Sequence, residues 1–145
     1  MDIKIKKINS LAKTPILGSE WAAGADLYAA TDYDIEIRPM QTVKIGTGIC
    51  IAIPEGYFGA IYARSGIAVK QGLRPANCVG VIDSDYRGEI IVALHNDSDI
   101  EQIIPAGSRI AQLVIQKFEP ICFQEVNELD ETVRGDGGFG STGTK

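Results

Sequence analysis

The sequence predicts an all-β fold, and three observations support that prediction. Apolar and polar residues alternate with a period of two along much of the chain, as they do in strands with one buried face. Five of the six prolines fall between these alternating runs, where turns are expected. Helical periodicity is scarce. Many short strands at this spacing are typical of a β-sandwich, a jelly roll or a β-barrel.

Four alternating runs predict strands in the first half of the chain, at residues 3–6, 35–38, 43–53 and 57–62. The third run keeps its apolar side chains on odd positions, but Gly46-Thr47-Gly48 interrupts it, which predicts a bulge or a bend. The turn residues Pro54-Glu55-Gly56 separate the third run from the fourth.

One short helix is expected at residues 66–71, with Ser65 as its N-cap and Gly72 as its C-terminal stop. Residues 126–133 are a second possible helix, because Val126, Leu129 and Val133 share one helical face. Three further strands are expected in the second half of the chain, at residues 89–94, 109–116 and 121–124.

Residues 134–145 differ in composition from the rest of the chain. They are rich in glycine, serine and threonine, and Phe139 is their only apolar side chain. Such a segment has too little apolar surface to offset the entropy lost on ordering. We therefore expect residues 1–133 to form the folded β domain and residues 134–145 to form a flexible, glycine-rich C-terminal arm.

The composition is that of one globular domain. The chain has 145 residues, of which 45% are hydrophobic and 23% charged, and these values exclude wholesale disorder. The net charge of −5 argues against nucleic acid or an anionic membrane as a partner. A phosphate-bearing ligand would therefore need a local concentration of arginine and backbone N–H groups.

The sequence also bears on location. The first ten residues contain no apolar run of signal-peptide length, and no stretch approaches 18 apolar residues. The three cysteines are far apart and form no Cys-x-x-Cys pair, which is typical of reduced thiols. We therefore expect a soluble, cytoplasmic protein.

Three segments carry side chains suited to phosphate chemistry. Arg64-Ser65-Gly66 combines a guanidinium, a hydroxyl and N–H groups at the expected helix start, although a surface arginine beside an ordinary cap would also explain it. In residues 80–88 two apolar residues lead into Asp83, which could orient a water, or the segment is a plain aspartate-rich turn. The arm is either a lid over an anion and a planar ring or an idle tail.

Five segments, taken in order, resemble the five motifs of the trimeric dUTP pyrophosphatases (dUTPases). They are Ala23-Gly24-Ala25-Asp26-Leu27-Tyr28, Arg64-Ser65-Gly66, residues 80–88, Arg109-Ile110-Ala111-Gln112-Leu113 and residues 134–143. The resemblance covers essentially the whole chain. It implies a jelly-roll-like β-barrel and a homotrimer whose three active sites each draw on all three subunits. It also implies Mg²⁺-dependent hydrolysis of dUTP to dUMP and pyrophosphate, which keeps uracil out of DNA and supplies dUMP for dTTP synthesis.

The resemblance also implies roles for individual residues. Asp83 would hold and deprotonate the water that attacks the α-phosphorus, and Ser65 would hydrogen-bond near the α–β bridging oxygen. The implied substrate contacts are Arg64, Gly66 and Gln112 near the phosphates, Tyr86 under the deoxyribose, Asn77, Gly80 and Val81 around the uracil, and Arg134, Phe139, Gly140, Ser141 and Thr142 of the arm. Asp26 and Arg109 would support the site, Asp26 acting through metal-bound water or through Arg109. No side chain is expected to bind Mg²⁺ directly.

Two alternatives remain from the sequence. A dCTP deaminase, or a bifunctional deaminase–dUTPase, would need a second serine, an arginine and a catalytic glutamate where this chain has Gly66, Lys70 and Ala93. Without a carboxylate at Ala93, deamination lacks a general base. The other alternative is a non-enzymatic regulatory binding protein of dUTPase fold, which would retain dUTP without releasing pyrophosphate.

Overall fold

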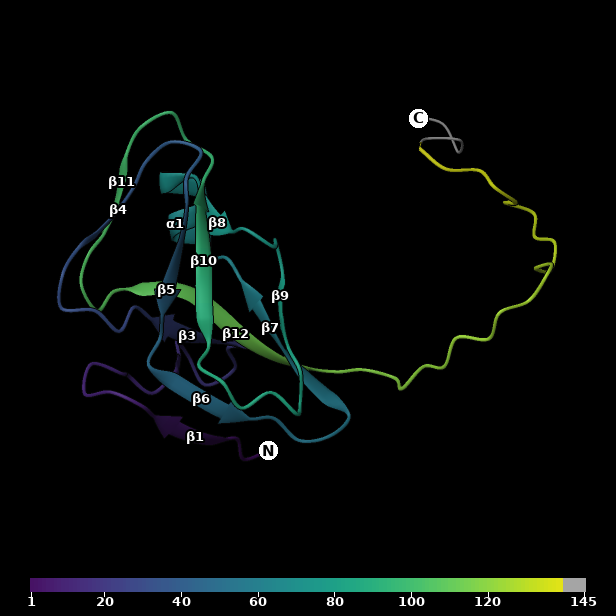
Figure 1. Cartoon of the computed structure of the whole chain (residues 1–145), viewed down its shortest axis with the longest axis horizontal. Coiled ribbons are helices and arrows are strands. Elements are labelled where there is room, and N and C mark those ends of the chain that lie inside the picture. Colours follow the sequence, from purple (N-terminus) through teal and green to yellow (C-terminus); the bar gives the residue numbers. More distant parts are fainter. Residues whose placement is uncertain (140–145) are drawn as a thin grey trace.

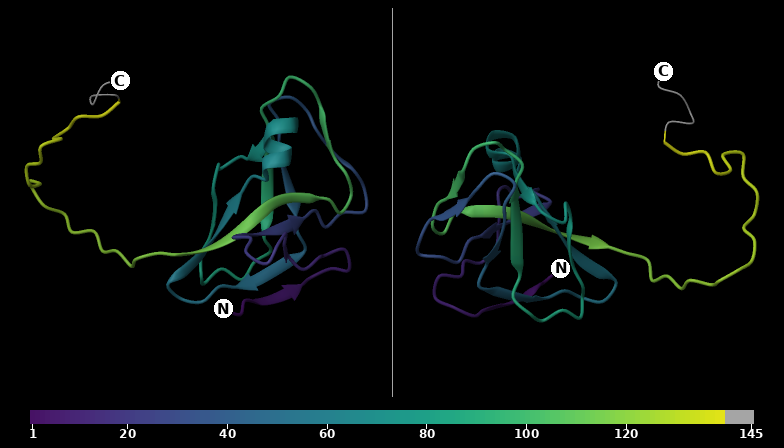
Figure 2. Two further views of the ribbon diagram at one scale, coloured as in Figure 1. Left: turned by 180° about the vertical axis from the view of Figure 1, so that it is seen from behind. Right: turned by 45° about the horizontal axis from the view of Figure 1, so that its top comes forward.

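A computed structural model describes residues 1–139 and confirms an all-β fold with one short helix. The strands form a compact, barrel-like body, and the chain after the last strand leads away from it (Figures 1 and 2). In order, the elements are β1 (Lys4–Lys7), β2 (Ile16–Leu17), β3 (Gly24–Tyr28), β4 (Ile35–Ile37), β5 (Thr42–Gly46), β6 (Ile49–Ala52), β7 (Tyr57–Tyr62), α1 (Ser65–Gln71), β8 (Leu73–Pro75), β9 (Gly80–Ile82), β10 (Ile91–Asn96), β11 (Gln102–Ile104) and β12 (Arg109–Lys117).

The strands pair in an order that differs from their order along the chain. The largest sheet runs β2-β3-β12-β7-β9, a second runs β5-β10-β8, and two strand pairs, β1-β6 and β11-β4, complete the body. All of these pairings are antiparallel. Strand β12 lies between β3 and β7 and so joins the two segments that carry Asp26 and Arg64. This is a jelly-roll type of arrangement.

The core is built from the alternate side chains of these strands. In β10, Val92 and Leu94 are buried while Ile91 is exposed, as the pleat of a strand requires. Asn96 continues the buried face, and its amide nitrogen donates to the carbonyls of Ile37 (2.9 Å) and Ile100 (2.8 Å). A buried polar side chain is thus fully paired and ties β10 to β4.

The short helix is confirmed, but its start differs from the prediction. Arg64 occupies the N-cap position with extended backbone angles, so the assignment of Ser65 as the N-cap is wrong. The Arg64 side chain makes no capping hydrogen bond, because a guanidinium has no acceptor for the helix N–H groups, and it donates to Asp26. Gly72 ends the helix at φ 64°, a conformation that glycine adopts without strain. Ser65 therefore lies in the first helical turn.

Two predicted elements after β12 are wrong. The strand at residues 121–124 and the helix at residues 126–133 are both absent, and Phe123, for example, is 90% exposed. A periodic pattern forms a strand or helix only where another surface covers its apolar face. Within the described residues of this single chain, nothing covers these side chains. The predicted bend between β5 and β6 is confirmed, with Gly48 at φ 68°.

Some short strands lie outside the predicted ranges, namely β2, β3, β8, β9 and β11. They are two to five residues long, which is too short for a clear alternation in the sequence. In the described part of the chain, no helix has the length and hydrophobicity needed to cross a bilayer.

Candidate active site

A pocket of about 280 Å³ opens between β7, β8, β9 and β10. It contains five of the residues predicted for substrate binding and catalysis: Asn77, Gly80, Val81, Asp83 and Tyr86. The volume falls just below the range of about 300–1,000 Å³ that is usual for small-ligand sites. The pocket is therefore large enough for a flat ring with part of a sugar, but too small to enclose a whole triphosphate.

The local fold explains how Asp83 reaches the mouth of this pocket. Strand β9 pairs with β7 through Gly80, Val81 and Ile82 and then ends. Asp83 begins the following turn, in which its carbonyl accepts a hydrogen bond from the Tyr86 N–H at 3.2 Å. Its exposed carboxylate is free to orient a water molecule beside a bound ligand.

The Tyr86 ring is held at the pocket by its neighbours. Its hydroxyl donates to the Glu89 carbonyl at 3.1 Å. A Cβ at Gly88 would overlap the Tyr86 hydroxyl, so only glycine leaves room for the ring in this position. The Glu89 carboxylate accepts from the Gly48 N–H at 2.7 Å, which ties the loop to the bend between β5 and β6.

A second group of predicted residues surrounds Asp26 on β3. One Asp26 oxygen accepts from Arg64 Nε at 2.7 Å, and the other accepts from Arg109 Nη1 at 3.1 Å. The Asp26 side chain is only 14% exposed. Gln112 of β12 donates to the Ala63 carbonyl at 2.9 Å, close to the start of α1. Two guanidinium groups are thus oriented by one carboxylate and retain further donors for an anion.

The two groups do not meet within this chain. The pocket lining contains neither Arg64 nor Gln112, and Ser65 and Gly66 belong to α1, outside the pocket. In the arm, Arg134 Nε donates to the Gly137 carbonyl at 2.9 Å and Phe139 is exposed. The chain after β12 runs away from the strands that form the pocket (Figure 1). The predicted residues Gly140, Ser141 and Thr142 lie outside the described residues.

The acidic, histidine and cysteine side chains show how a metal ion would have to be held. Among residues 1–139, no three acidic, histidine or cysteine side chains come together in a cluster able to hold a metal ion. Asp26 already accepts from an arginine on each oxygen. The described residues therefore offer no ready-made protein cage for a cation.

Sequence reasoning missed several residues that line the pocket. Glu89, Ile91 and Val92 belong to it, and so does Ala93, the position at which the deaminase alternative was expected to need a carboxylate. The position of Glu89 depends on its contact with Gly48, 41 residues earlier in the chain. No local pattern in the sequence predicts such a contact.

Comparisons with known proteins agree with these features. The dUTPase family model matches residues 11–143. A relative from Finegoldia magna, named deoxyuridine 5'-triphosphate nucleotidohydrolase, is 50% identical over 145 residues and covers 99% of each chain. A relative of the same name from Rickettsia prowazekii is 48% identical over 144 residues, covering 99% of this chain and 97% of its own. The dUTPase of Staphylococcus bacteriophage 80alpha, solved with dUPNHPP, superposes with a TM-score of 0.88 at 28% identity and covers 98% of each chain.

Proposed function

The chain belongs to the dUTPase family, and on this basis we propose that it hydrolyses dUTP to dUMP and pyrophosphate. The observation that carries the proposal is the pocket that brings Asn77, Asp83 and Tyr86 together. A base, a sugar and an attacking water each have a suitable group there. The Arg64–Asp26–Arg109 cluster supplies the positive charge that a triphosphate needs in an otherwise acidic protein.

The base would be recognised by hydrogen-bond polarity. Asn77, together with the backbone of Gly80 and Val81, would face the edge of the uracil ring. A site arranged for the 4-oxo group meets the 4-amino group of cytosine donor to donor, which leaves a buried donor unpaired. Tyr86 would pack under the deoxyribose and leave no room for a ribose 2′-hydroxyl. Its ring is already fixed by Gly88 and by the Glu89 carbonyl.

The chemistry would start from a water held by Asp83. The carboxylate accepts a proton as the water attacks the α-phosphorus, and pyrophosphate leaves. Ser65 would donate a hydrogen bond near the bridging oxygen, where negative charge develops. Arg64, Gly66 and Gln112 would hold the phosphate chain. One Gln112 amide hydrogen already bonds Ala63, so the other remains for the substrate.

We propose that Mg²⁺ binds together with the phosphates of the substrate. When bound, it neutralises part of the charge on the phosphates. It would be held by phosphate oxygens and water, as Mg²⁺ commonly is, because the described side chains form no cage for it. Asp26 would act at most through a metal-bound water, and otherwise through the two arginines that it orients.

We further propose a homotrimer with shared active sites. Two features support it: the separation of the two groups of site residues within one chain, and the exposed apolar side chains after β12, such as Phe123 and Leu129. In a trimer, Asp83 of one subunit would face the arginine cluster of a second subunit. The arm of the third subunit would close over the substrate and contribute Arg134, Phe139, Gly140, Ser141 and Thr142.

The free thiols of Cys50, Cys78 and Cys122 fit a reducing, cytoplasmic location.

The function is tested by incubating the purified protein with dUTP and Mg²⁺ and measuring pyrophosphate. We expect dUMP and pyrophosphate in equal amounts, with UTP and dCTP turned over far more slowly. Ammonia release from dCTP would indicate a deaminase. Retention of dUTP without pyrophosphate release would indicate a regulatory binding protein.

A further inference from the structure

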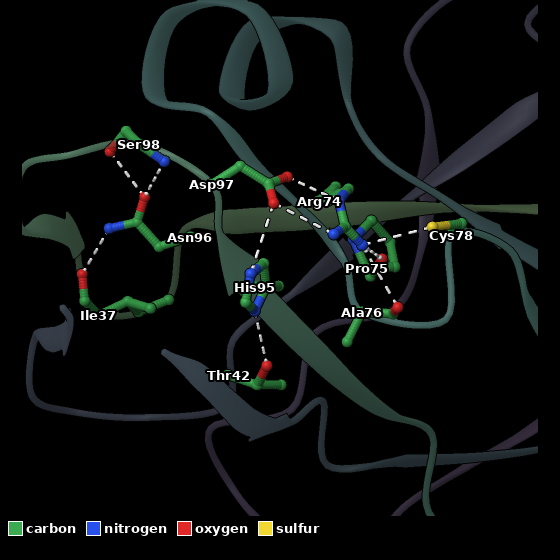
Figure 3. Close-up of polar contacts among 10 residues, drawn as sticks. All are labelled: Ile37, Thr42, Arg74, Pro75, Ala76, Cys78, His95, Asn96, Asp97 and Ser98. Atoms are coloured by element: carbon green, nitrogen blue, oxygen red, sulfur yellow. Dashed lines mark hydrogen bonds and ion pairs between the residues drawn. The ribbon is translucent and has the colours of Figure 1, made fainter. Parts of the chain in front are cut away.

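The turn that carries Asn77 is contacted by an arginine outside the pocket. Arg74 lies on β8, and its Nη1 atom is 3.4 Å from the Pro75 carbonyl, 3.3 Å from the Ala76 carbonyl and 3.3 Å from Cys78 Sγ (Figure 3). The two contacts with carbonyl oxygens are long for hydrogen bonds, and sulfur is a weak acceptor, so each contact is individually weak. Together they place one guanidinium group against both sides of the turn.

Asp97 fixes this guanidinium from the opposite side. Arg74 Nε and Nη2 donate to the two Asp97 oxygens at 2.6 and 3.1 Å, which is a bidentate ion pair (Figure 3). Asp97 is itself anchored, because its N–H donates to the Gly72 carbonyl at 2.9 Å. His95 Nε2 lies 3.4 Å from the same carboxylate, and His95 Nδ1 lies 2.8 Å from Thr42 Oγ1. The hydrogen bond with Asp97 raises the pKa of Arg74 above its ordinary value, and an arginine is charged at every working pH even without that shift.

The turn has a backbone conformation that needs support. Cys78 has a φ of 63°, which is uncommon for a residue with a side chain. The Val79 N–H donates to the Asn77 carbonyl at 2.7 Å, so Cys78 is the central residue of a three-residue turn with positive φ. Turns of this kind are rare and strained, and they persist only where the surroundings hold them.

We propose that Arg74, held by Asp97, is a positioning residue for base recognition: it keeps residues 75–78 in the strained turn that presents Asn77 to the pocket. Arg74 does not itself line the pocket. Asn77 lies directly beside the start of β9, since a Cβ added at Gly80 would come within 3.3 Å of Asn77 Nδ2. The identity of the base, uracil, rests on the proposed function.

The first test is Arg74→Gln, which removes the charge and the ion pair. We expect the KM for dUTP and the Kd for dUMP to rise by about 5–10-fold, while kcat stays within about 2-fold, because Asp83 and Ser65 lie on other elements. A merely structural role would lower kcat through loss of active protein and leave KM and Kd unchanged. Arg38→Gln is the matched control, since Arg38 is exposed and distant in the chain, and it should behave as wild type.

The second test asks whether the backbone strain at Cys78 is the reason why the turn needs Arg74. Glycine adopts a positive φ without cost to a side chain, so a turn with Cys78→Gly needs the guanidinium less. We expect Cys78→Gly in the Arg74→Gln background to bring the KM and the dUMP Kd back to within about 2-fold of Cys78→Gly alone. If Arg74→Gln raises the KM and the dUMP Kd by the same factor in the Cys78→Gly background as in the wild-type background, the proposal is overturned. Asp97→Asn should reproduce the Arg74→Gln effect, and it serves as the test if Arg74→Gln does not fold.

A third readout separates this inference from the proposed function. Hydrogen exchange of the Val79 amide, measured without any nucleotide, should be faster in Arg74→Gln than in wild type, while the amides of β12 stay unchanged. If the wild-type protein does not hydrolyse dUTP, the proposed function fails, and the exchange measurement still decides whether Arg74 holds the turn. If the wild-type protein is active but Arg74→Gln leaves KM, Kd and Val79 exchange unaltered, the inference itself is wrong.

Discussion

Asp83 and Asp85 lie two residues apart in one loop, but only Asp83 lines the pocket. Replacing Asp83 by asparagine keeps the shape of the side chain and removes its ability to accept a proton. We expect Asp83→Asn to bind dUTP with little change in KM and to lose about 10²–10⁴-fold in kcat. Steady-state pyrophosphate release measures both constants. Asp85→Asn, a change of the same kind in the same loop, should keep wild-type turnover; if the two variants behave alike, Asp83 is not the base.

Tyr86 and Gly88 allow a second prediction at the scale of single residues. Tyr86→Ala removes the ring proposed to exclude the 2′-hydroxyl, and Gly88→Ala forces that ring to move because of the overlap with its hydroxyl. Both changes should reduce the preference for dUTP over UTP, expressed as a ratio of kcat/KM values, by about 10–100-fold. Tyr86→Phe keeps the ring and loses only the bond to Glu89, so it should retain most of the preference. An unchanged ratio in Tyr86→Ala would assign sugar selection to another residue.

At the scale of elements, Asn96 is the clearest case of a side chain that joins two strands. Its amide donates to Ile37 of β4 and to Ile100 in the loop before β11. Asn96→Ala removes both of these hydrogen bonds and the two that the Asn96 side-chain carbonyl accepts from Ser98, and we expect it to lower the free energy of unfolding by about 2–4 kcal/mol. Urea unfolding measures the change. Asp99→Ala, at an exposed position nearby, should stay within about 0.5 kcal/mol of wild type.

The elements also show which structural features a sequence can predict and which it cannot. Strand β7 and the helix α1 were predicted because their patterns are local: alternation in one case, and a glycine stop in the other. The apolar pattern at residues 126–133 is as regular, yet no helix forms, because a helix of this length needs a surface to pack against. The N-cap at Arg64 was missed because arginine has no side-chain acceptor and therefore gives no cap signal, whereas the neighbouring Ser65 does.

The candidate site also contains some residues that the sequence can predict and others that it cannot. Asp83 and Tyr86 were predicted from a motif and Asn77 from the family resemblance, and the structure places all three around one pocket. Glu89 and Arg74 were not predicted. They act through Gly48 and Asp97, and these contacts exist only once distant strands have paired. Motifs and a family resemblance therefore identify the residues proposed to contact the substrate, whereas the residues that hold them in place are found only in the folded structure.

At the scale of the whole molecule, the arm should matter for activity and not for folding. The described part of the arm bonds to nearby residues of its own segment, as in the hydrogen bonds of Gly135 to Thr132 and Gly137 to Arg134, and adds nothing to the core. Truncation after Val133 should therefore leave circular dichroism and the thermal midpoint unchanged and lower kcat/KM for dUTP by at least about 100-fold. Full activity in the truncated protein would mean that the arm is not a lid.

The sharing of sites between subunits can be tested by combining two inactive proteins. Light scattering should first give a molar mass of three chains. In a shared site, Asp83 comes from one subunit and the arm from another, so the Asp83→Asn protein and the protein truncated after Val133 fail for different reasons. When the two are refolded together in equal amounts, about a quarter of the sites receive an intact Asp83 from one partner and an intact arm from the other. We therefore expect activity to return to about a quarter of wild type. If each site were built from one chain, no mixed trimer would contain a complete site and the mixture would stay as inactive as its components.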